Sequence, residues 1–176
     1  MGAEPIIGYI PKFVMPANFG TGYFSIFITP KRVVFIRIGK DYSTGVFYLL
    51  GAVGFIIGKA FDYENSPAFR NINLDSLLSE NEDNREVLID RITKIKMKKA
   101  FGGDYRLYIY GYGLHDVKKL LFEGLFEVPK EDLERNRRQG YKKQVILKHY
   151  VAECQKQIQR CLGDKLVETV KPKHLK

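Results

Sequence analysis

The side chains of this chain that could do chemistry are basic ones set at a regular spacing. In the segment VLIDRITKIKMKK, Lys94, Lys96 and Lys98 alternate with Ile95 and Met97. Successive side chains of a β-strand point to opposite faces, so this spacing predicts one basic face and one buried face. Ammonium groups attract phosphate and carboxylate groups, and we therefore expect the basic face to bind an anionic ligand. The residues expected to form this site are Lys94, Lys96, Lys98, Lys99, Lys31 and Arg32.

Residues suited to catalysis form no recognisable group in the sequence. His115, His149 and His174 stand in a turn, a helix and a terminal segment, and no nucleophile or carboxylate accompanies them at a spacing typical of a triad. The pair Glu131-Asp132 stands at an expected helix start, where interaction with the helix dipole explains it. We expect a protein that is not an enzyme, with a catalytic group assembled from distant positions as the less favoured alternative.

The two cysteines indicate a reducing environment. Cys154 and Cys161 are seven residues apart in a segment with a helical pattern. The rise of about 10 Å between them is too large for an intrachain disulfide. Neither has histidines at the spacing of a zinc site, and we expect no metal and no cofactor. The first residues, MGAEPIIGYIPKF, lack the features of a signal peptide. Together these observations predict a cytoplasmic protein, with attachment to the membrane periphery as a further option.

Positive charge is concentrated in the second half of the chain. Residues 1–84 carry 7 basic and 8 acidic side chains, whereas residues 85–176 carry 22 basic and 12 acidic ones, a net charge of −1 against +10. A lopsided positive field favours contact with phosphate groups, whether these belong to lipids or to nucleic acids. The alternative is a solvated charged surface that merely keeps the protein dispersed.

The elements expected to carry these side chains are strands in the first two thirds of the chain. Residues 1–22, rich in Gly and Pro, are typical of an extended lead-in with turns. The run YFSIFITPKRVVFIRIG predicts two strands around a turn at 29–32. The segment EVLIDRITKIKMKK predicts a strand, and YRLYIYGYG completes a hairpin with it around 101–104. The segment 114–129 fits strand or helix equally.

Helices are expected mainly after Pro129. A short helical pattern covers residues 73–78, and the polar run SENEDNRE after it suggests a surface loop. Beyond a break at Gly140, apolar residues follow a four-three spacing along one seam of a helix over 141–162. The seam residues are Leu147, Val151, Cys154, Ile158 and Cys161. The seam predicts a helix laid across an opening of the sheet, with homodimerisation as its second use. Residues 164–176 are expected to form a basic tail that need not be ordered.

Two segments resemble a known group of families. FITPKRVVFIRIG looks like the early strand pair of GRAM and prokaryotic pleckstrin-homology-like (PH-like) domains, in which a Thr precedes a basic residue and an apolar strand. VLIDRITKIKMKK resembles a later strand in which these families place an acidic residue, here Asp90, before an Ile-x-x-Ile pair, here Ile92 and Ile95. The similarity covers about residues 23–127 and the helix after them. It implies a binding module for membranes or protein partners, without catalytic apparatus.

The fold implied by this resemblance is a single α+β domain over residues 1–163. It is a PH-like antiparallel β-barrel or a strongly bent sheet, with a C-terminal capping helix. The chain departs from the family pattern in two respects. The final helix contains no tryptophan, and residues 46–84 form a large insertion with a Gly-rich helical part.

An uncharged stretch, GVFYLLGAVGFIIG at 45–58, could lie in the core or at a membrane. As a helix its 14 residues would reach about 21 Å, short of the ~30 Å hydrocarbon thickness of a bilayer. Its glycines lack the spacing of a dinucleotide-binding or phosphate-binding loop. A buried Gly-rich helix or hairpin is the favoured interpretation. Shallow contact with a membrane through Phe47, Leu50, Phe55 and Ile56 is the second.

These observations favour a non-catalytic binding module that associates with an anionic membrane surface or with a protein partner. A nucleic-acid-binding protein is the alternative, because four tyrosines stand beside basic residues and resemble an aromatic platform for bases. They are Tyr105, Tyr108, Tyr110 and Tyr112. This alternative requires exposed tyrosines, and half of them are expected to pack inward. A scaffold that dimerises through the helix over 141–162 is the third interpretation.

Overall fold

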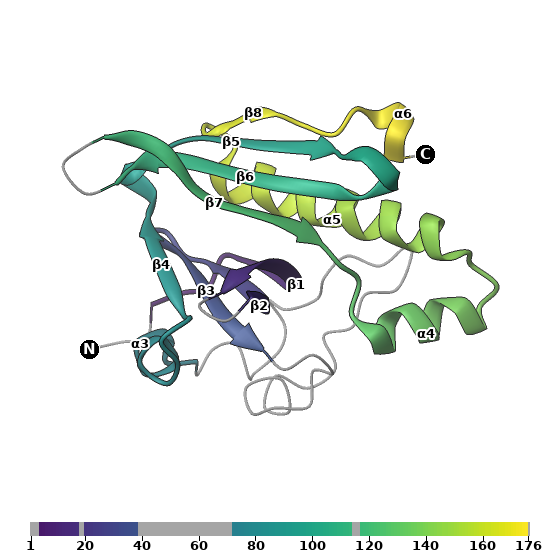
Figure 1. The fold of residues 1–176 in the computed structure, drawn as a ribbon, viewed down its shortest axis with the longest axis horizontal. Helices are drawn as coiled ribbons and strands as arrows, with labels where there is room; N and C mark the ends of the chain where they lie inside the picture. Colours follow the sequence, from purple (N-terminus) through teal and green to yellow (C-terminus); the bar gives the residue numbers. More distant parts are fainter. Residues whose placement is uncertain (1–3, 18–19, 39–71, 114–116, 176) are drawn as a thin grey trace.

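The computed structural model describes residues 4–17, 20–38, 72–113 and 117–175. These residues form a mixed α+β fold of one eight-stranded sheet and four helices (Figure 1). The strands are β1 (Gly8–Ala17), β2 (Gly20–Ile28), β3 (Arg32–Ile38), β4 (Arg85–Leu88), β5 (Ile92–Lys99), β6 (Tyr105–Tyr112), β7 (Lys118–Phe126) and β8 (Leu166–Glu168). The helices are α3 (Leu74–Ser79), α4 (Lys130–Arg138), α5 (Lys143–Leu162) and α6 (Pro172–Leu175). The expected α+β class is therefore confirmed.

The sheet is open among the described residues. Its strands follow the order β4-β3-β2-β1-β7-β6-β5-β8, so β4 and β8 form its two edges. A closed barrel would require β4 to pair with the free edge of β5. That edge is instead occupied by β8, which pairs with β5 in parallel. The expected closed barrel is therefore wrong, whereas a bent sheet agrees with the structure. Figure 1 shows β1–β4 and β5–β7 running in different directions, and β1 joins these two groups by pairing with both β2 and β7.

The strand β1 differs from the extended lead-in expected for the first residues. Proline lacks the N–H group that a ladder needs, and a Pro-rich segment therefore argues against a central strand. Pro11 lies at a shift in register between Ile10 and Phe13. Pro16 lies beyond the two residues, Phe13 and Val14, that pair with β7. Each proline thus stands where β1 is not paired along both of its edges, which allows the segment to form a strand.

The segment around Lys94 forms two strands rather than one. β4 ends at Leu88, a short 3-10 turn covers Ile89–Arg91, and β5 begins directly after it. Within β5 the predicted alternation is confirmed, because Ile95 and Met97 are buried in the core while the lysines between them are not. The basic face and the buried face therefore lie on β5 as expected.

Three other elements correspond to patterns in the sequence. The hairpin predicted around 101–104 forms from β5 and β6, which pair antiparallel. The ambiguous segment 114–129 contains β7 as a single strand. The helical pattern at 73–78 forms α3, and the side chain of Asn73 caps it by accepting two backbone N–H hydrogen bonds of 3.1 Å from its first turn.

Helix α5 closes the hydrophobic core. Its seam residues Leu147, Val151, Cys154 and Ile158 are buried in one cluster with residues of β1, β2, β3, β5 and β6. The predicted break at Gly140 separates α4 from α5, and its φ of 90° is a left-handed conformation that favours glycine. These seam residues therefore pack inside the chain, which was the favoured use of the seam, and homodimerisation stays a prediction.

The C-terminal residues up to 175 fold against the sheet, in the segment 164–176 that was expected to form a basic tail without a requirement for order. The backbone N–H of Ile95 donates a hydrogen bond of 2.7 Å to the carbonyl of Lys165, next to β8. The hydroxyl of Tyr105 donates one of 2.7 Å to the carbonyl of His174 in α6. These contacts place the basic C-terminal segment beside the β5–β6 hairpin.

Candidate anion-binding surface

The residues expected to bind an anion lie in two separate places. Four of them are on β5, and two are at the turn between β2 and β3. In the sheet, β2, β1, β7 and β6 lie between β3 and β5. The β5 residues are Lys94, Lys96, Lys98 and Lys99, and those of the turn are Lys31 and Arg32. The structure therefore does not bring the six residues together in one site.

The row of lysines on β5 is partly neutralised within the protein. The Nζ atoms of Lys96 and Lys98 each lie 3.3 Å from a carboxylate oxygen of Glu168 on β8. Desolvation raises the pKa of Glu168, but the hydrogen bonds from both lysines together outweigh it and leave this pKa below its ordinary value. The Nζ of Lys94 lies 4.6 Å from the ring centroid of Tyr110, within the range of a cation–π interaction. Sequence reasoning missed Glu168 because it comes from a distant part of the chain.

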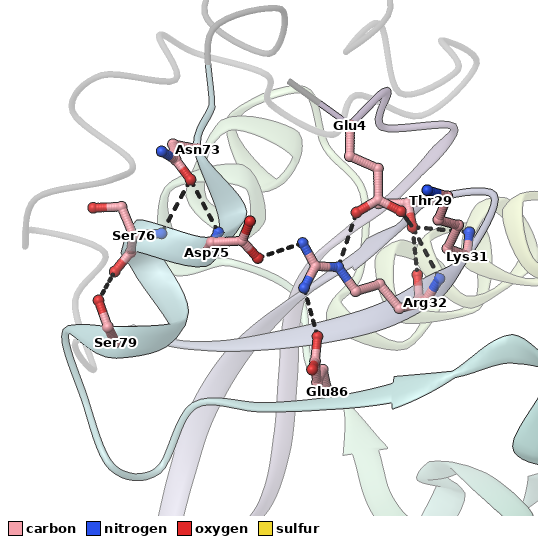
Figure 2. Close-up of polar contacts among 9 residues, drawn as sticks. All are labelled: Glu4, Thr29, Lys31, Arg32, Asn73, Asp75, Ser76, Ser79 and Glu86. Atoms are coloured by element: carbon pink, nitrogen blue, oxygen red, sulfur yellow. Dashed lines mark hydrogen bonds and ion pairs between the residues drawn. The ribbon is translucent and has the colours of Figure 1, made fainter. Parts of the chain in front are cut away.

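Arg32 acts as a clamp between three segments of the chain (Figure 2). Its guanidinium donates hydrogen bonds of 2.9 Å to Glu4, 2.6 Å to Asp75 and 2.7 Å to Glu86. These carboxylates come from the N-terminal segment, from α3 and from β4, and only 15% of the Arg32 side chain is exposed. Desolvation lowers the pKa of Arg32, but the three hydrogen bonds raise it above its ordinary value. Arg32 is therefore charged and already occupied by carboxylates.

The turn that precedes Arg32 belongs to the same network. The Thr29 hydroxyl donates to the Glu4 carboxylate at 2.7 Å and accepts from the backbone N–H groups of Lys31 and Arg32 at 3.2 and 3.0 Å (Figure 2). A groove of about 830 Å³ lies beside this network. Its lining includes the carboxylates of Glu4 and Asp75 as well as both cations. Because charges of both signs line it, the groove is poorly suited to select an anion.

A second group of cations, which sequence reasoning did not assemble, surrounds His174 in α6. The pKa of this histidine is below its ordinary value, first because of desolvation and then because of the positive field of four lysines. These lysines are Lys99, Lys173, Lys171 and Lys148. They come from β5, from α5 and from the C-terminal segment, so the fold rather than the local sequence gathers them. The closing run KPKHLK was the available signal.

The start of α5 adds further cations to the same region. The Gln144 side chain lies against the hairpin turn, since a Cβ added at Gly103 would be 3.6 Å from the Gln144 amide nitrogen. In Figure 1 this hairpin, α6 and the first turns of α5 lie at the same end of the molecule. The region also holds the carboxylate of Asp104, which follows the hairpin turn, and that of Glu168, which pairs with Lys98 next to Lys99. We call this region the basic end, and its cations are Lys99, Lys142, Lys143, Lys148, Lys171 and Lys173.

The tyrosines of β6 divide unequally between the two faces of the sheet. Tyr105 is buried, whereas Tyr108 and Tyr110 are partly exposed and Tyr112 is 39% exposed. In the register of β5 and β6, Lys96 stands opposite Tyr108 and Lys94 opposite Tyr110. Three of the four tyrosines therefore point outward beside lysines, one more than the sequence pattern suggested. We call Tyr108, Tyr110 and Tyr112 the tyrosine row.

The expected membrane-contact residues Phe47, Leu50, Phe55 and Ile56 lie outside the described residues. The same holds for the whole apolar stretch 45–58, so its place in the core or at a membrane stays a prediction. In the part of the chain that the structure describes, no helix is both long enough and apolar enough to cross a membrane.

Comparison with known proteins adds no family assignment. No protein-family model matches the chain, and no curated protein is significantly similar to it. The resemblance to PH-like and GRAM domains therefore stays a prediction, and the function is argued from the residues of the chain itself.

Proposed function

We propose that this chain is a non-catalytic binding module that docks on an anionic membrane surface through its basic end. The observation that carries the proposal is the gathering of Lys99, Lys171 and Lys173 around His174, whose pKa is lowered first by desolvation and then by the positive field of these lysines. Near an anionic membrane each such cation contributes about 1 kcal/mol to binding. Because six cations converge at this end, their combined attraction is sufficient for reversible attachment.

The fold is proposed to be PH-like, and the strand order supports this assignment. β1–β4 and β5–β7 form two antiparallel groups that share β1 and β7 as neighbours. The long helix α5 follows the last of these strands and covers the core. The chain departs from the simple pattern by adding α4, β8 and α6. A PH-like fold is consistent with a binding module, since the resemblance carries no catalytic residues.

Charge reversal at the basic end tests the proposed function. The variant Lys99→Glu/Lys171→Glu/Lys173→Glu changes three exposed side chains and leaves the core intact. Co-sedimentation is measured with phosphatidylcholine vesicles that contain or lack phosphatidylserine. The wild type is expected to bind only the anionic vesicles. The variant is expected to bind them more than about a hundredfold more weakly, because three favourable charges are lost.

A matched control reverses the same amount of charge elsewhere. Lys31, Arg91 and Lys119 are exposed and lie away from the hairpin turn at 101–103, on the β2–β3 turn, on the 3-10 turn before β5, and on β7. Their reversal is expected to weaken binding by less than about tenfold, because charges beyond a Debye length are screened. Equal losses in both variants would mean that net charge alone drives binding. An absence of binding by the wild type would reject the membrane function.

Binding of single-stranded nucleic acid is the second candidate function, and the tyrosine row favours it. Stacking of a base on an exposed aromatic side chain contributes about 1–3 kcal/mol. Lys94 and Lys96 stand beside this row and could contact the phosphates. In an anisotropy titration with a fluorescent oligothymidylate, Tyr110→Ala is expected to weaken binding by about tenfold. No rise in anisotropy with the wild type at low salt would remove this candidate.

A further inference from the structure

The β5–β6 hairpin ends in a fully exposed aromatic side chain. Phe101 has a relative exposure of 103%, although it is flanked by a well-packed strand pair. The turn is closed by a hydrogen bond of 2.8 Å from the Ala100 N–H to the Asp104 carbonyl. Gly102 and Gly103 adopt φ of 82° and 92°, which are left-handed conformations that favour glycine. The tight turn therefore presents Phe101 to solvent at the tip of the hairpin.

Cations border this tip on the side of β5. Lys98 and Lys99 are exposed and come just before the turn. The first turn of α5 borders the other side, where Gln144 lies against Gly103. Phe101 thus projects from the basic end and is surrounded by groups that an anionic surface would attract.

The start of α5 also contributes apolar area next to the tip. Tyr141 and Val145 are 39% and 36% exposed. They stand on either side of Lys142, Lys143 and Gln144 in the sequence. Apolar and basic side chains are therefore interleaved at this end, a combination typical of surfaces that lie in a membrane interface.

Other exposed apolar side chains in the described residues lie elsewhere. Leu88 on β4 and Val167 on β8 belong to edge strands. Three more, each less exposed than Phe101, lie at the β6–β7 end of the sheet, namely Val117, Leu120 and Tyr112. Single exposed apolar residues are ordinary on protein surfaces and need no special explanation. Phe101 differs because its full exposure coincides with the cations that would bring it against a negatively charged bilayer.

We propose that Phe101 inserts into the interfacial region of an anionic bilayer while the lysines around it contact lipid headgroups. The inference rests on the proposed function, because insertion follows docking. The phenyl ring gains free energy by leaving water. Long lysine stems can lie along apolar surface while their ammonium groups stay at the level of the headgroups. Attraction and insertion therefore act at the same tip.

A single tryptophan can report on this position, because the chain contains none. Phe101→Trp places the probe at the tip, and its full exposure allows the change without repacking. Leu88→Trp is the matched control, since Leu88 is 43% exposed on the edge strand β4, away from the β5–β6 turn. Both variants are mixed with phosphatidylcholine–phosphatidylserine vesicles, and co-sedimentation is measured on the same samples. The emission of Phe101→Trp is expected to shift to shorter wavelength and to be quenched by lipids brominated in their acyl chains. That of Leu88→Trp is expected to stay unchanged.

The outcomes separate the insertion from the docking. Co-sedimentation with neither a shift nor quenching at position 101 would overturn the insertion and leave the docking intact. Equal shifts in both variants would overturn the assignment to Phe101. A failure of both variants to sediment with anionic vesicles would overturn the docking and the insertion together. As a complementary test, Phe101→Ser is expected to weaken vesicle binding by about tenfold. The melting temperature is expected to be unchanged, because the side chain makes no core contact.

Discussion

Among single residues, Arg32 carries the densest ionic contacts of the described residues and is expected to matter for stability. Arg32→Gln removes the charge that holds three carboxylates together, and the free energy of unfolding is expected to fall by about 2 kcal/mol, between the values of exposed and buried pairs. Arg32→Lys keeps the charge but lacks the planar guanidinium with its several N–H donors. Its free energy of unfolding is therefore expected to fall by less than that of Arg32→Gln. Urea denaturation measures both. An unchanged midpoint for Arg32→Gln would contradict the clamp.

Glu168 restrains two of the lysines that the sequence offered for anion binding. Glu168→Gln keeps the shape of the side chain but removes the negative charge that pairs with Lys96 and Lys98. Both lysines can then interact with an anionic membrane. Binding to anionic vesicles is expected to tighten by roughly fivefold, because the released charges lie beside the basic end. Weaker or unchanged binding in a vesicle titration would show that the face of β5 takes no part in docking.

Two buried acids predict how stability depends on alkaline pH. Burial raises the pKa of the Cys154 thiol and of the Tyr150 hydroxyl above their ordinary values of 9.0 and 10.0. The folded protein therefore holds these protons more tightly than the unfolded chain does. Their contribution to stability is fully present below 9.0 and is lost as the pH rises above it. Urea denaturation on either side of that pH measures the loss, and Cys154→Ala is expected to show a shallower decline. An equal decline of stability in the wild type and in Cys154→Ala would show that Cys154 does not contribute to the pH dependence.

Among the elements, the junction of β1 and β7 connects the two groups of strands through only two residue pairs, Phe13↔Phe126 and Val14↔Leu125. Gly124 lies at this junction, where an added Cβ would stand 2.3 Å from the Val14 carbonyl oxygen. Because the backbone of β1 cannot move aside easily, Gly124→Ala is expected to lower the free energy of unfolding by about 2–3 kcal/mol.

The control for this change is Gly140→Ala. A Cβ at Gly140 would meet open space, but the φ of 90° is unfavourable for alanine. The free energy of unfolding is therefore expected to fall by about 1 kcal/mol. Thermal and urea denaturation compare the two variants. A loss in Gly124→Ala no larger than that in Gly140→Ala would contradict the close packing of β7 on β1.

Elements with a strong local period could be predicted from the sequence. The alternation of lysines with Ile95 and Met97 defined β5, and the four-three spacing defined α5, because each pattern reflects which face is buried. β1 could not be predicted, since its prolines are tolerated only through its particular pairing. The pairing of β8 with β5 was equally inaccessible, because it joins residues far apart in the chain.

In the candidate site too, residues in a local pattern could be predicted, whereas contacts between distant parts of the chain could not. The lysines of β5 were visible in the sequence, but their partner Glu168 was not. Lys171 and Lys173 stand in a segment without any period, so composition alone favoured a tail. The exposure of Phe101 depends on a hairpin turn whose glycines were recognised, yet nothing local showed that its side chain would stay out of the core.

On the scale of the whole molecule, the fold distributes charge unevenly. The clamp of Arg32 balances cations with carboxylates near the β2–β3 turn, whereas the basic end carries an excess of lysines on the opposite side of Figure 1. Such an asymmetry orients a protein as it approaches a charged surface. Vesicle binding is therefore expected to weaken as salt is added, since the Debye length is about 8 Å at physiological ionic strength.

Hydrogen exchange of the wild type, free and bound to phosphatidylserine-containing vesicles, would locate the docking surface without any substitution. If the protein docks through its basic end, exchange on binding slows mainly in peptides covering 97–105, the first turn of α5 and 170–175. Protection confined to the tyrosine row or to residues 45–58, with none at the basic end, would contradict this docking.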